Sequence, residues 1–121
     1  MTKTIIVAED SSSVRKFITL ALKMKGYNVI TAEDGMAALE QFPKQKVDLL
    51  LTDLNMPNMD GLNLIRNVRL IPDYKELPII ILSSLSDEED INAGLGAGAN
   101  SYLIKPFNQK KVQYEVSKYL I

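Results

Sequence analysis

Short apolar runs alternate along the chain with longer segments in which apolar residues recur every three or four positions. The apolar runs predict strands at residues 5–8, 29–32, 49–52, 79–82 and 101–104. The periodic segments predict helices from Ser11 to Gly26, from Gly35 through Phe42, from Gly61 to about Ile71, from Asp87 through Ala97, and around residues 112–120. Strict alternation of strands and helices is typical of an α/β domain.

Several of the predicted strands are apolar at consecutive positions, as strands are when both faces of a sheet are covered. This pattern indicates five parallel strands in one doubly wound sheet with helices on both faces. A strand order of 2-1-3-4-5 is one of the two common arrangements at this size. Residues 1–121 are expected to form one domain with no output domain, because no linker, repeat or low-complexity segment interrupts them.

The helical pattern is weakest in the fourth predicted helix. Gly94 and Gly96 each cost about 1 kcal/mol relative to alanine in a helix interior. The segment can therefore be easier to remodel than its neighbours, although plain low propensity explains the glycines equally well.

The composition excludes several kinds of chemistry. The chain has neither cysteine nor histidine, which excludes disulfides, thiolate catalysis, a histidine-based triad and a phosphohistidine of its own. The net charge is −1 and the lysines are dispersed along the sequence, so we expect no nucleic acid or membrane partner. No run is long enough to span a bilayer and no signal-peptide pattern opens the chain, so a cytoplasmic location is expected.

Polar side chains stand directly after four of the predicted strands. Glu9 and Asp10 follow the first strand, Asp53 the third, Ser83 the fourth and Lys105 the fifth. The carboxyl ends of parallel strands meet at one edge of a sheet, where ligands bind in folds of this kind. Like charges about 4 Å apart repel by about 1 kcal/mol in water and by about 4 kcal/mol near a protein surface. Three converging carboxylates therefore require a cation or a proton.

Oxygen ligands without histidine or cysteine favour Mg²⁺ or Mn²⁺ at this edge. Lys105 adds an ammonium group and Ser83 a hydroxyl group near Asp53. Together these groups could hold a phosphoryl group on Asp53, which would act as the nucleophile. Taken singly, each residue is more often a helix cap, a turn residue or a solvated side chain. Their coincidence at four strand ends favours a site.

Other motifs fail on inspection. An EF-hand loop opening at Asp53 would place Pro57 and Leu64 at ligand positions and Asn58 where glycine is needed. The glycines at 94, 96 and 98 do not directly follow a strand, as a dinucleotide fingerprint requires. Two carboxylates after the first strand would repel a flavin phosphate, so FMN is not expected.

The strand-end residues belong to a longer pattern that runs through the whole chain. It comprises Glu9-Asp10, Asp53 within Asp-Leu-Asn-Met-Pro-Asn-Met-Asp-Gly, Ser83, Tyr102 and Lys105-Pro106-Phe107. In order and spacing the sequence resembles a response-regulator receiver domain of two-component signalling, most closely the stand-alone CheY type. The resemblance implies a flavodoxin-like fold.

The resemblance also implies a role for each of these residues. Asp53 is the expected phosphoacceptor, Lys105 the phosphoryl-binding lysine and Ser83 the hydroxyl that moves onto the phosphoryl group. Tyr102 is the expected switch aromatic that follows Ser83, and the Lys105-Pro106 bond is expected to be cis. The expected metal ligands are Glu9, Asp10, the side chain of Asp53 and the main-chain carbonyl of Asn55.

Departures from the usual family pattern are modest. Glu9 replaces the commoner aspartate and lengthens one arm of the acidic pair, while Ser83 replaces the commoner threonine. Asn55 and Leu85 occupy the positions that tune dephosphorylation in the family. An apolar Leu85 cannot hydrogen-bond an attacking water through its side chain.

The function implied is signalling and not metabolic catalysis. A sensor histidine kinase would donate the phosphoryl group, and the phosphorylated form would act on a protein target through the fourth helix, fifth strand and fifth helix, as a monomer or a weak phosphorylation-dependent dimer. The chain would promote only its own phosphotransfer and dephosphorylation, and a chemotaxis-type pathway is expected. The alternatives are a phosphorelay intermediate, a phosphorylation-independent scaffold and a Mg²⁺-dependent phosphohydrolase. The phosphohydrolase would need a second aspartate where Asn55 stands.

Overall fold

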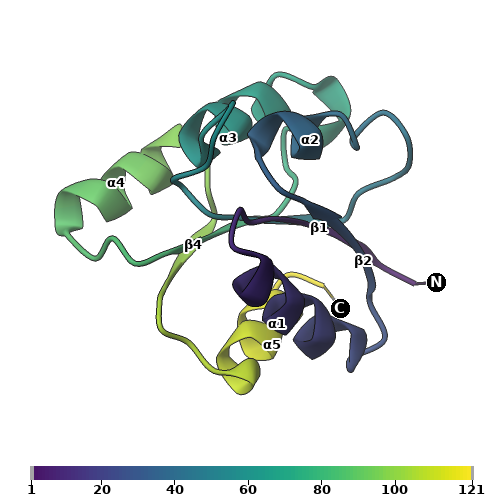
Figure 1. Ribbon diagram of the computed structural model, residues 1–121. Coiled ribbons are helices and arrows are strands. Elements are labelled where there is room, and N and C mark those ends of the chain that lie inside the picture. Colours follow the sequence, from purple (N-terminus) through teal and green to yellow (C-terminus); the bar gives the residue numbers. More distant parts are fainter. Residues whose placement is uncertain (1, 121) are drawn as a thin grey trace.

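Strands and helices alternate through residues 2–120, the part of the chain that the computed structural model describes. A central sheet separates two layers of helices, with α1 and α5 on one side and α2, α3 and α4 on the other (Figure 1). The strands are β1 (Thr4–Ala8), β2 (Asn28–Ala32), β3 (Leu49–Thr52), β4 (Ile79–Ser83) and β5 (Ser101–Ile104). The helices are α1 (Ser12–Lys23), α2 (Gly35–Leu39), α3 (Gly61–Arg69), α4 (Glu88–Ala97) and α5 (Gln109–Ser117).

All five strands are parallel, in the order β2-β1-β3-β4-β5. This confirms the predicted fold class and strand order. The register pairs Ala8 of β1 with Thr52 of β3, and Ser83 of β4 with Ile104 of β5. The last residues of these four strands therefore lie along one edge of the sheet, and the polar residues that follow them share that edge.

The core lies on both sides of the sheet because successive strand residues point to opposite faces. Ile6, Leu50 and Ile81 pack under α2, α3 and α4, and Leu51 and Ile80 pack under α1 and α5. These side chains are at most 1% exposed. Burial of each side chain stabilises the fold by about 1.5–3 kcal/mol relative to exposure. The central strands therefore hold the residues that directly follow them in fixed positions.

Helix bounds differ from the sequence prediction by up to three residues, and two differences affect the core. Helix α2 ends at Leu39 and not at Phe42, because the amides of Gln41 and Phe42 bond three residues back and turn the chain tightly. This turn points the Phe42 ring into the core, where it packs edge-on against Tyr74 with centroids 5.1 Å apart. Tyr74 closes a short 3₁₀ helix, Pro72–Tyr74, that the periodic pattern did not predict.

Side-chain caps begin four of the five α-helices. Ser11, Asp34, Asp60 and Asn108 each accept a hydrogen bond from an amide in the first turn of the helix that follows. Asp60 is thus a helix cap, in line with its position just before Gly61.

None of the helices in residues 2–120 is both long enough and apolar enough to cross a membrane.

We predict opposite effects of alanine at two helical glycines. A Cβ atom at Gly61 would overlap the main-chain oxygen of Asp53, whereas a Cβ atom at the exposed Gly96 would meet nothing. Gly61→Ala should therefore lower the free energy of unfolding by about 1–3 kcal/mol, and Gly96→Ala should raise it by up to about 1 kcal/mol. Urea denaturation at equilibrium measures both, and equal changes in the same direction would contradict the assignment.

Candidate functional site

Three carboxylates meet at the carboxyl edge of the sheet. Glu9 and Asp10 follow β1 and Asp53 follows β3, and one oxygen from each lies within 4.8 Å of the others. Glu9 is 1% exposed and Asp53 is 8% exposed, while Asp10 faces solvent. The convergence expected from the strand order is present, with two of the three charges removed from bulk water.

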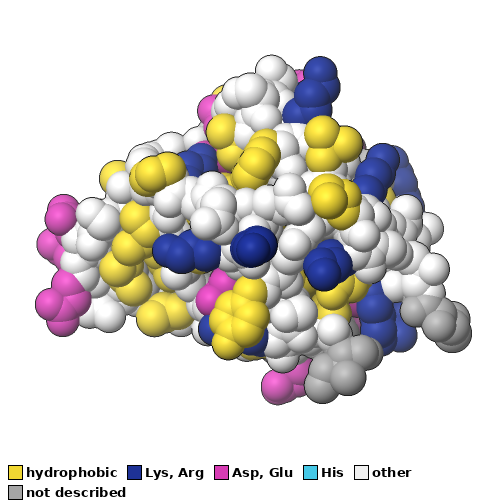
Figure 2. All heavy atoms as spheres, turned by 90° about the horizontal axis from the view of Figure 1, so that it is seen from below, with side chains coloured by type: hydrophobic (Ala, Val, Ile, Leu, Met, Phe, Trp, Pro, Cys, Tyr) yellow, Lys and Arg dark blue, Asp and Glu magenta, His cyan; other side chains and the backbone are white. Residues whose placement is uncertain are grey.

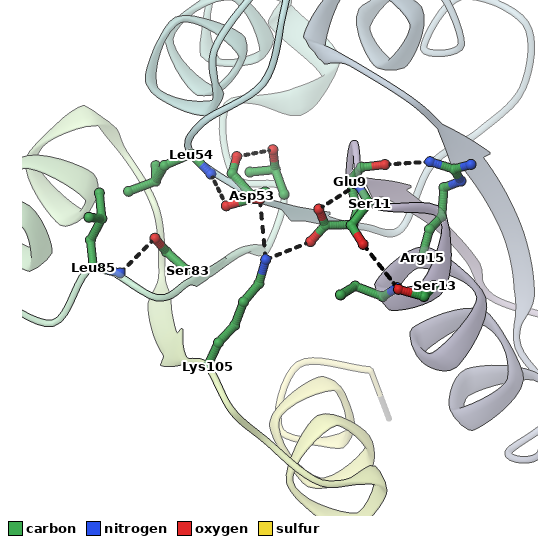
Figure 3. Close-up of polar contacts among 11 residues, drawn as sticks. Glu9, Ser11, Ser13, Arg15, Asp53, Leu54, Ser83, Leu85 and Lys105 are labelled. Atoms are coloured by element: carbon green, nitrogen blue, oxygen red, sulfur yellow. Dashed lines mark hydrogen bonds and ion pairs between the residues drawn. The ribbon is translucent and has the colours of Figure 1, made fainter.

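Lys105 reaches into this group from the end of β5 (Figure 3). Its Nζ donates to Glu9 Oε1 at 2.8 Å and to Asp53 Oδ2 at 3.2 Å. The peptide bond between Lys105 and Pro106 is cis. One ammonium group thus bridges the two buried carboxylates and offsets part of their mutual repulsion.

The pKa values follow from this arrangement. Burial raises the pKa of the Glu9 carboxyl, and the hydrogen bonds from Lys105 and from the Ser11 amide offset this only in part. Burial acts to lower the pKa of Lys105, but the hydrogen bond to Glu9 and the charge of Asp53 outweigh it and raise that pKa. The Lys105 ammonium therefore stays charged across the physiological range.

The main chain fixes the orientation of both buried acids. The Asp53 amide donates to Ala8 O at 2.9 Å, and Asp53 Oδ1 accepts from the Leu54 amide at 2.7 Å. Glu9 Oε2 accepts from the Ser11 amide at 3.1 Å, and Arg15 Nη1 donates to Glu9 O at 2.7 Å (Figure 3). One oxygen of each carboxylate is thus held by the backbone, and the other faces Lys105.

The loop after β3 is anchored to the start of α2. Asn58 adopts a left-handed conformation with φ 67°, which asparagine tolerates better than most residues, and its Nδ2 donates to Asp34 Oδ2 at 2.6 Å. The Gly35 amide donates to Met59 O at 3.1 Å. These contacts position the segment that carries Asn55, whose side chain is exposed.

The main chain of Leu85 links the two expected switch residues. Its amide donates to Ser83 Oγ at 3.1 Å, and its carbonyl accepts from the Tyr102 hydroxyl at 2.7 Å. Ser83 is 1% exposed. From the sequence, Leu85 was expected only to tune dephosphorylation. Its two contacts are made by the main chain, so the identity of the residue does not predict them.

Helix α4 packs against Ile81 and Tyr102 at Gly94. A Cβ atom at Gly94 would lie 2.5 Å from Ile81 Cδ1 and 3.4 Å from the Tyr102 ring. The absence of a side chain at Gly94 therefore lets α4 approach the aromatic ring closely.

The three carboxylates fit a divalent ion by their chemistry and spacing. Oxygens on opposite sides of an octahedral Mg²⁺ are about 4.2 Å apart, which is comparable to the spread of the three side-chain oxygens. Hard oxygen donors without nitrogen or sulfur suit Mg²⁺ or Mn²⁺. Glu9, Asp10 and Asp53 could therefore hold such an ion with small side-chain adjustments.

Most of the residues singled out by sequence are gathered here, but two contacts besides those of Leu85 were missed. The pairing of Glu9 with Lys105 was not predicted, although the longer arm of glutamate was noticed and could have suggested it. The bond from Asn58 to Asp34 joins two loops that are far apart in sequence, so no local pattern announces it. The roles that the resemblance implies for these residues, including the Asn55 carbonyl, stay predictions.

The fold and the site together define a doubly wound α/β domain with a largely buried acidic cluster and a lysine at the carboxyl ends of its strands. Residues 5–117 match the family described as the response regulator receiver domain. The chain belongs to this family, as the sequence resemblance predicted.

Known relatives of the chain differ in length. The chain is 38% identical over 112 residues to a probable transcriptional regulator, ycf27, of Galdieria sulphuraria, covering 93% of this chain and 43% of that protein. It is 32% identical to the chemotaxis protein CheY-3 of Vibrio cholerae, covering 94% of this chain and 88% of that protein. The chain therefore spans about half the length of the ycf27 relatives and most of the chemotaxis relative.

Solved structures agree closely with the fold. The chemotaxis response regulator CheY4 of Vibrio cholerae superposes with a TM-score of 0.94 at 32% identity, covering 99% of this chain and all of that one. The receiver domain of the sensor histidine kinase PA1611 of Pseudomonas aeruginosa, solved with a magnesium ion coordinated in its active-site cleft, has a TM-score of 0.90 at 29% identity and covers 98% of each chain.

The stabilising effect of Asp34 should depend on pH. Hydrogen bonds from the Ala37 amide and from Asn58 hold the pKa of Asp34 below its usual value. A lowered pKa means that the carboxylate stabilises the fold above the unfolded-state pKa and that this stabilisation is lost as the pH falls through the folded-state pKa. Asp34→Ala should therefore cost about 1 kcal/mol at pH 7 and clearly less near pH 3.

Urea denaturation at several pH values tests this prediction. Asp73→Ala, which removes an exposed acid from the 3₁₀ helix, serves as the control. The assignment of the cap would be wrong if the difference between wild type and Asp34→Ala were the same at pH 3 and pH 7.

Proposed function

We propose that Asp53 accepts a phosphoryl group from a phosphohistidine of a sensor histidine kinase, in a reaction that requires Mg²⁺ or Mn²⁺. The observation that carries this proposal is the position of Lys105, whose Nζ lies 3.2 Å from Asp53 Oδ2 beside a cluster of three carboxylates. Membership of the receiver family supports it. The phosphohistidine must lie outside these 121 residues, because they contain no histidine.

Each group has a defined task in the proposed transfer. An oxygen of Asp53 forms the new P–O bond while the P–N bond to the donor imidazole breaks, and the imidazole nitrogen keeps the electron pair and takes a proton. The Leu54 amide holds Oδ1 and so orients the carboxylate. The Lys105 ammonium group exchanges its contact with Asp53 Oδ2 for a contact with the transferred phosphoryl oxygens. A divalent ion held by Glu9, Asp10, Asp53 and the Asn55 carbonyl would neutralise the rest of that charge.

We further propose that Ser83 and Tyr102 transmit the phosphorylated state to the surface. Both bond to the main chain of Leu85, so a shift of Ser83 toward the phosphoryl group would disturb the acceptor of the Tyr102 hydroxyl. Tyr102 lies on β5 next to α4, and exposed Leu95 and Ile104 lie on the same two elements. The face formed by α4, β5 and α5 is thus the proposed contact surface for a downstream protein.

The output pathway is proposed to be of the chemotaxis type, in the cytoplasm. The likeness to a chemotaxis protein over most of that protein's length supports this proposal. Likeness to longer transcriptional regulators keeps a phosphorelay or another output as the alternative.

Incubation with acetyl phosphate and Mg²⁺ tests the acceptor directly. Intact-mass spectrometry should detect the addition of one phosphoryl group to the wild-type protein and none to Asp53→Asn. Asp60→Asn is a matched control, because it removes a carboxylate from the same loop while asparagine still caps α3, and it should be phosphorylated normally. Failure of the wild type to incorporate phosphate would sink the proposal and favour a scaffold, whereas sustained hydrolysis of phosphate esters would indicate a phosphohydrolase.

The length of Glu9 should affect affinity for Mg²⁺. Its 2.8 Å bond draws the Lys105 ammonium toward the carboxylates that the ion would occupy, so the two cations compete. Glu9→Asp shortens the arm and should raise the Mg²⁺ affinity by about tenfold, the equivalent of about 1.4 kcal/mol. Isothermal titration calorimetry measures this without phosphorylation.

Lys105→Met made in both backgrounds provides the control. It should raise the Mg²⁺ affinity more in the presence of Glu9 than in the presence of aspartate at that position, because only the longer arm holds the lysine close. Unchanged or weaker binding of Mg²⁺ by Glu9→Asp would contradict the competition.

A further inference from the structure

The fold gathers basic residues that are dispersed in the sequence. Helices α1 and α5 lie side by side on one face of the sheet (Figure 1), and Gln113 Nε2 donates to Ala21 O at 2.8 Å between them. Residues 12–25 contain four basic side chains and no acidic one, and residues 109–118 contain three lysines and one glutamate. This face is therefore strongly positive on a chain whose net charge is −1, although its lysines are dispersed along the sequence.

Large apolar side chains are exposed among these basic groups. Leu20, Met24 and Tyr114 are 61%, 67% and 63% exposed. Leu20 and Met24 are four residues apart and so lie on the same side of the helix. Figure 2 views this face and shows hydrophobic patches interrupted by lysine and arginine, with acidic side chains mainly at its left edge.

A hollow of about 450 Å³ lies between the end of α1, the start of β2 and α5. We call it the α1–α5 groove, and its lining residues are Lys25, Tyr27, Lys110, Gln113, Tyr114 and Ser117. The lining combines two ammonium groups with two aromatic rings. Such a hollow takes one or two large side chains, with positive charge at its rim.

We propose that the α1–α5 groove binds an acidic protein segment that carries a large apolar side chain. The apolar side chain would fill the hollow against Tyr27 and Tyr114, and carboxylates beside it would pair with Lys25 and Lys110. A flat bilayer cannot fill a concave hollow. Nucleic acid carries no aliphatic side chain that could fill the hollow between the two tyrosines. The proposal is independent of phosphorylation, because none of the lining residues belongs to the acidic site.

A random peptide library displayed on phage is the probe. Selection on the wild-type protein should enrich peptides with net negative charge and at least one large apolar residue. Titration of a synthetic copy of an enriched peptide into ¹⁵N-labelled protein should shift the amide resonances of Lys25, Tyr27 and Gln113. Raised salt should weaken binding, since the rim charges are exposed.

Two variants test the contacts, and two further variants serve as controls. Lys25→Glu with Lys110→Glu should weaken peptide binding about tenfold, and Tyr114→Ala should weaken it by a similar factor. Lys44→Glu is the control, because it makes the same kind of charge change at an exposed lysine outside the groove, and it should leave the affinity within about twofold. Asp53→Asn should bind normally, which separates this inference from the proposed phosphorylation.

Several outcomes would overturn the inference. These are enrichment of neutral or basic peptides, no acidic enrichment at all, shifts confined to the carboxyl edge of the sheet, or equal effects of the groove variants and Lys44→Glu. Binding to vesicles of phosphatidylglycerol and phosphatidylcholine without binding of acidic peptides would assign the face to a membrane instead.

Discussion

The ionic contact on which the site depends is the bridge of Lys105 between Glu9 and Asp53. Two carboxylates that are almost fully removed from water repel each other, and each also bears a desolvation cost. The ammonium group 2.8 Å from one and 3.2 Å from the other provides the nearest compensating charge. Because that ammonium group is at the end of a flexible side chain, its positive charge can move to another nearby anion. The backbone of the site is held rigidly, whereas the ion pairs of Lys105 with Glu9 and Asp53 can rearrange. Such a site suits a lysine that moves from a carboxylate to another anionic group.

The backbone around the site is firm because of how the sheet is built. The residues that precede Glu9 and Asp53 are the last ones of buried parallel strands, and Ala8 pairs with Thr52 in the register. Asp53 then continues the pairing by donating its amide to Ala8 O. Where the strand ends, Gly61 allows the following helix to start against the main chain of Asp53. Carboxylate positions are therefore set by strand register and close backbone packing, while only Lys105 arrives on a long side chain.

The sequence pattern was sufficient for the strands and for the polar residues at their ends. The strand order was one of two common arrangements until the resemblance to the receiver family implied a flavodoxin-like fold. Runs such as Leu49–Thr52 have no helical periodicity and stop at a polar residue, so each strand end could be identified together with the residue after it. Features that depend on tertiary contact were not accessible in this way. Phe42 fits the helical period, yet packing against Tyr74 turns it inward. The basic face formed by α1 and α5 is also invisible in a linear sequence, because residues about ninety positions apart create it.

The two proposed switch residues illustrate the difference between what residue type and main-chain geometry contribute. Ser83 and Tyr102 were identified through the family resemblance, but the connection between them passes through the amide and carbonyl of Leu85, which any residue except proline provides. The side chain at position 85 is therefore free to vary without breaking the link, and Gly94 lets α4 lie close to the aromatic ring. A movement of Ser83 would act on a single peptide segment that also holds the Tyr102 hydroxyl. Coupling through one short segment of backbone requires no chain of specific side chains, so it would survive wide sequence change on the surrounding surface.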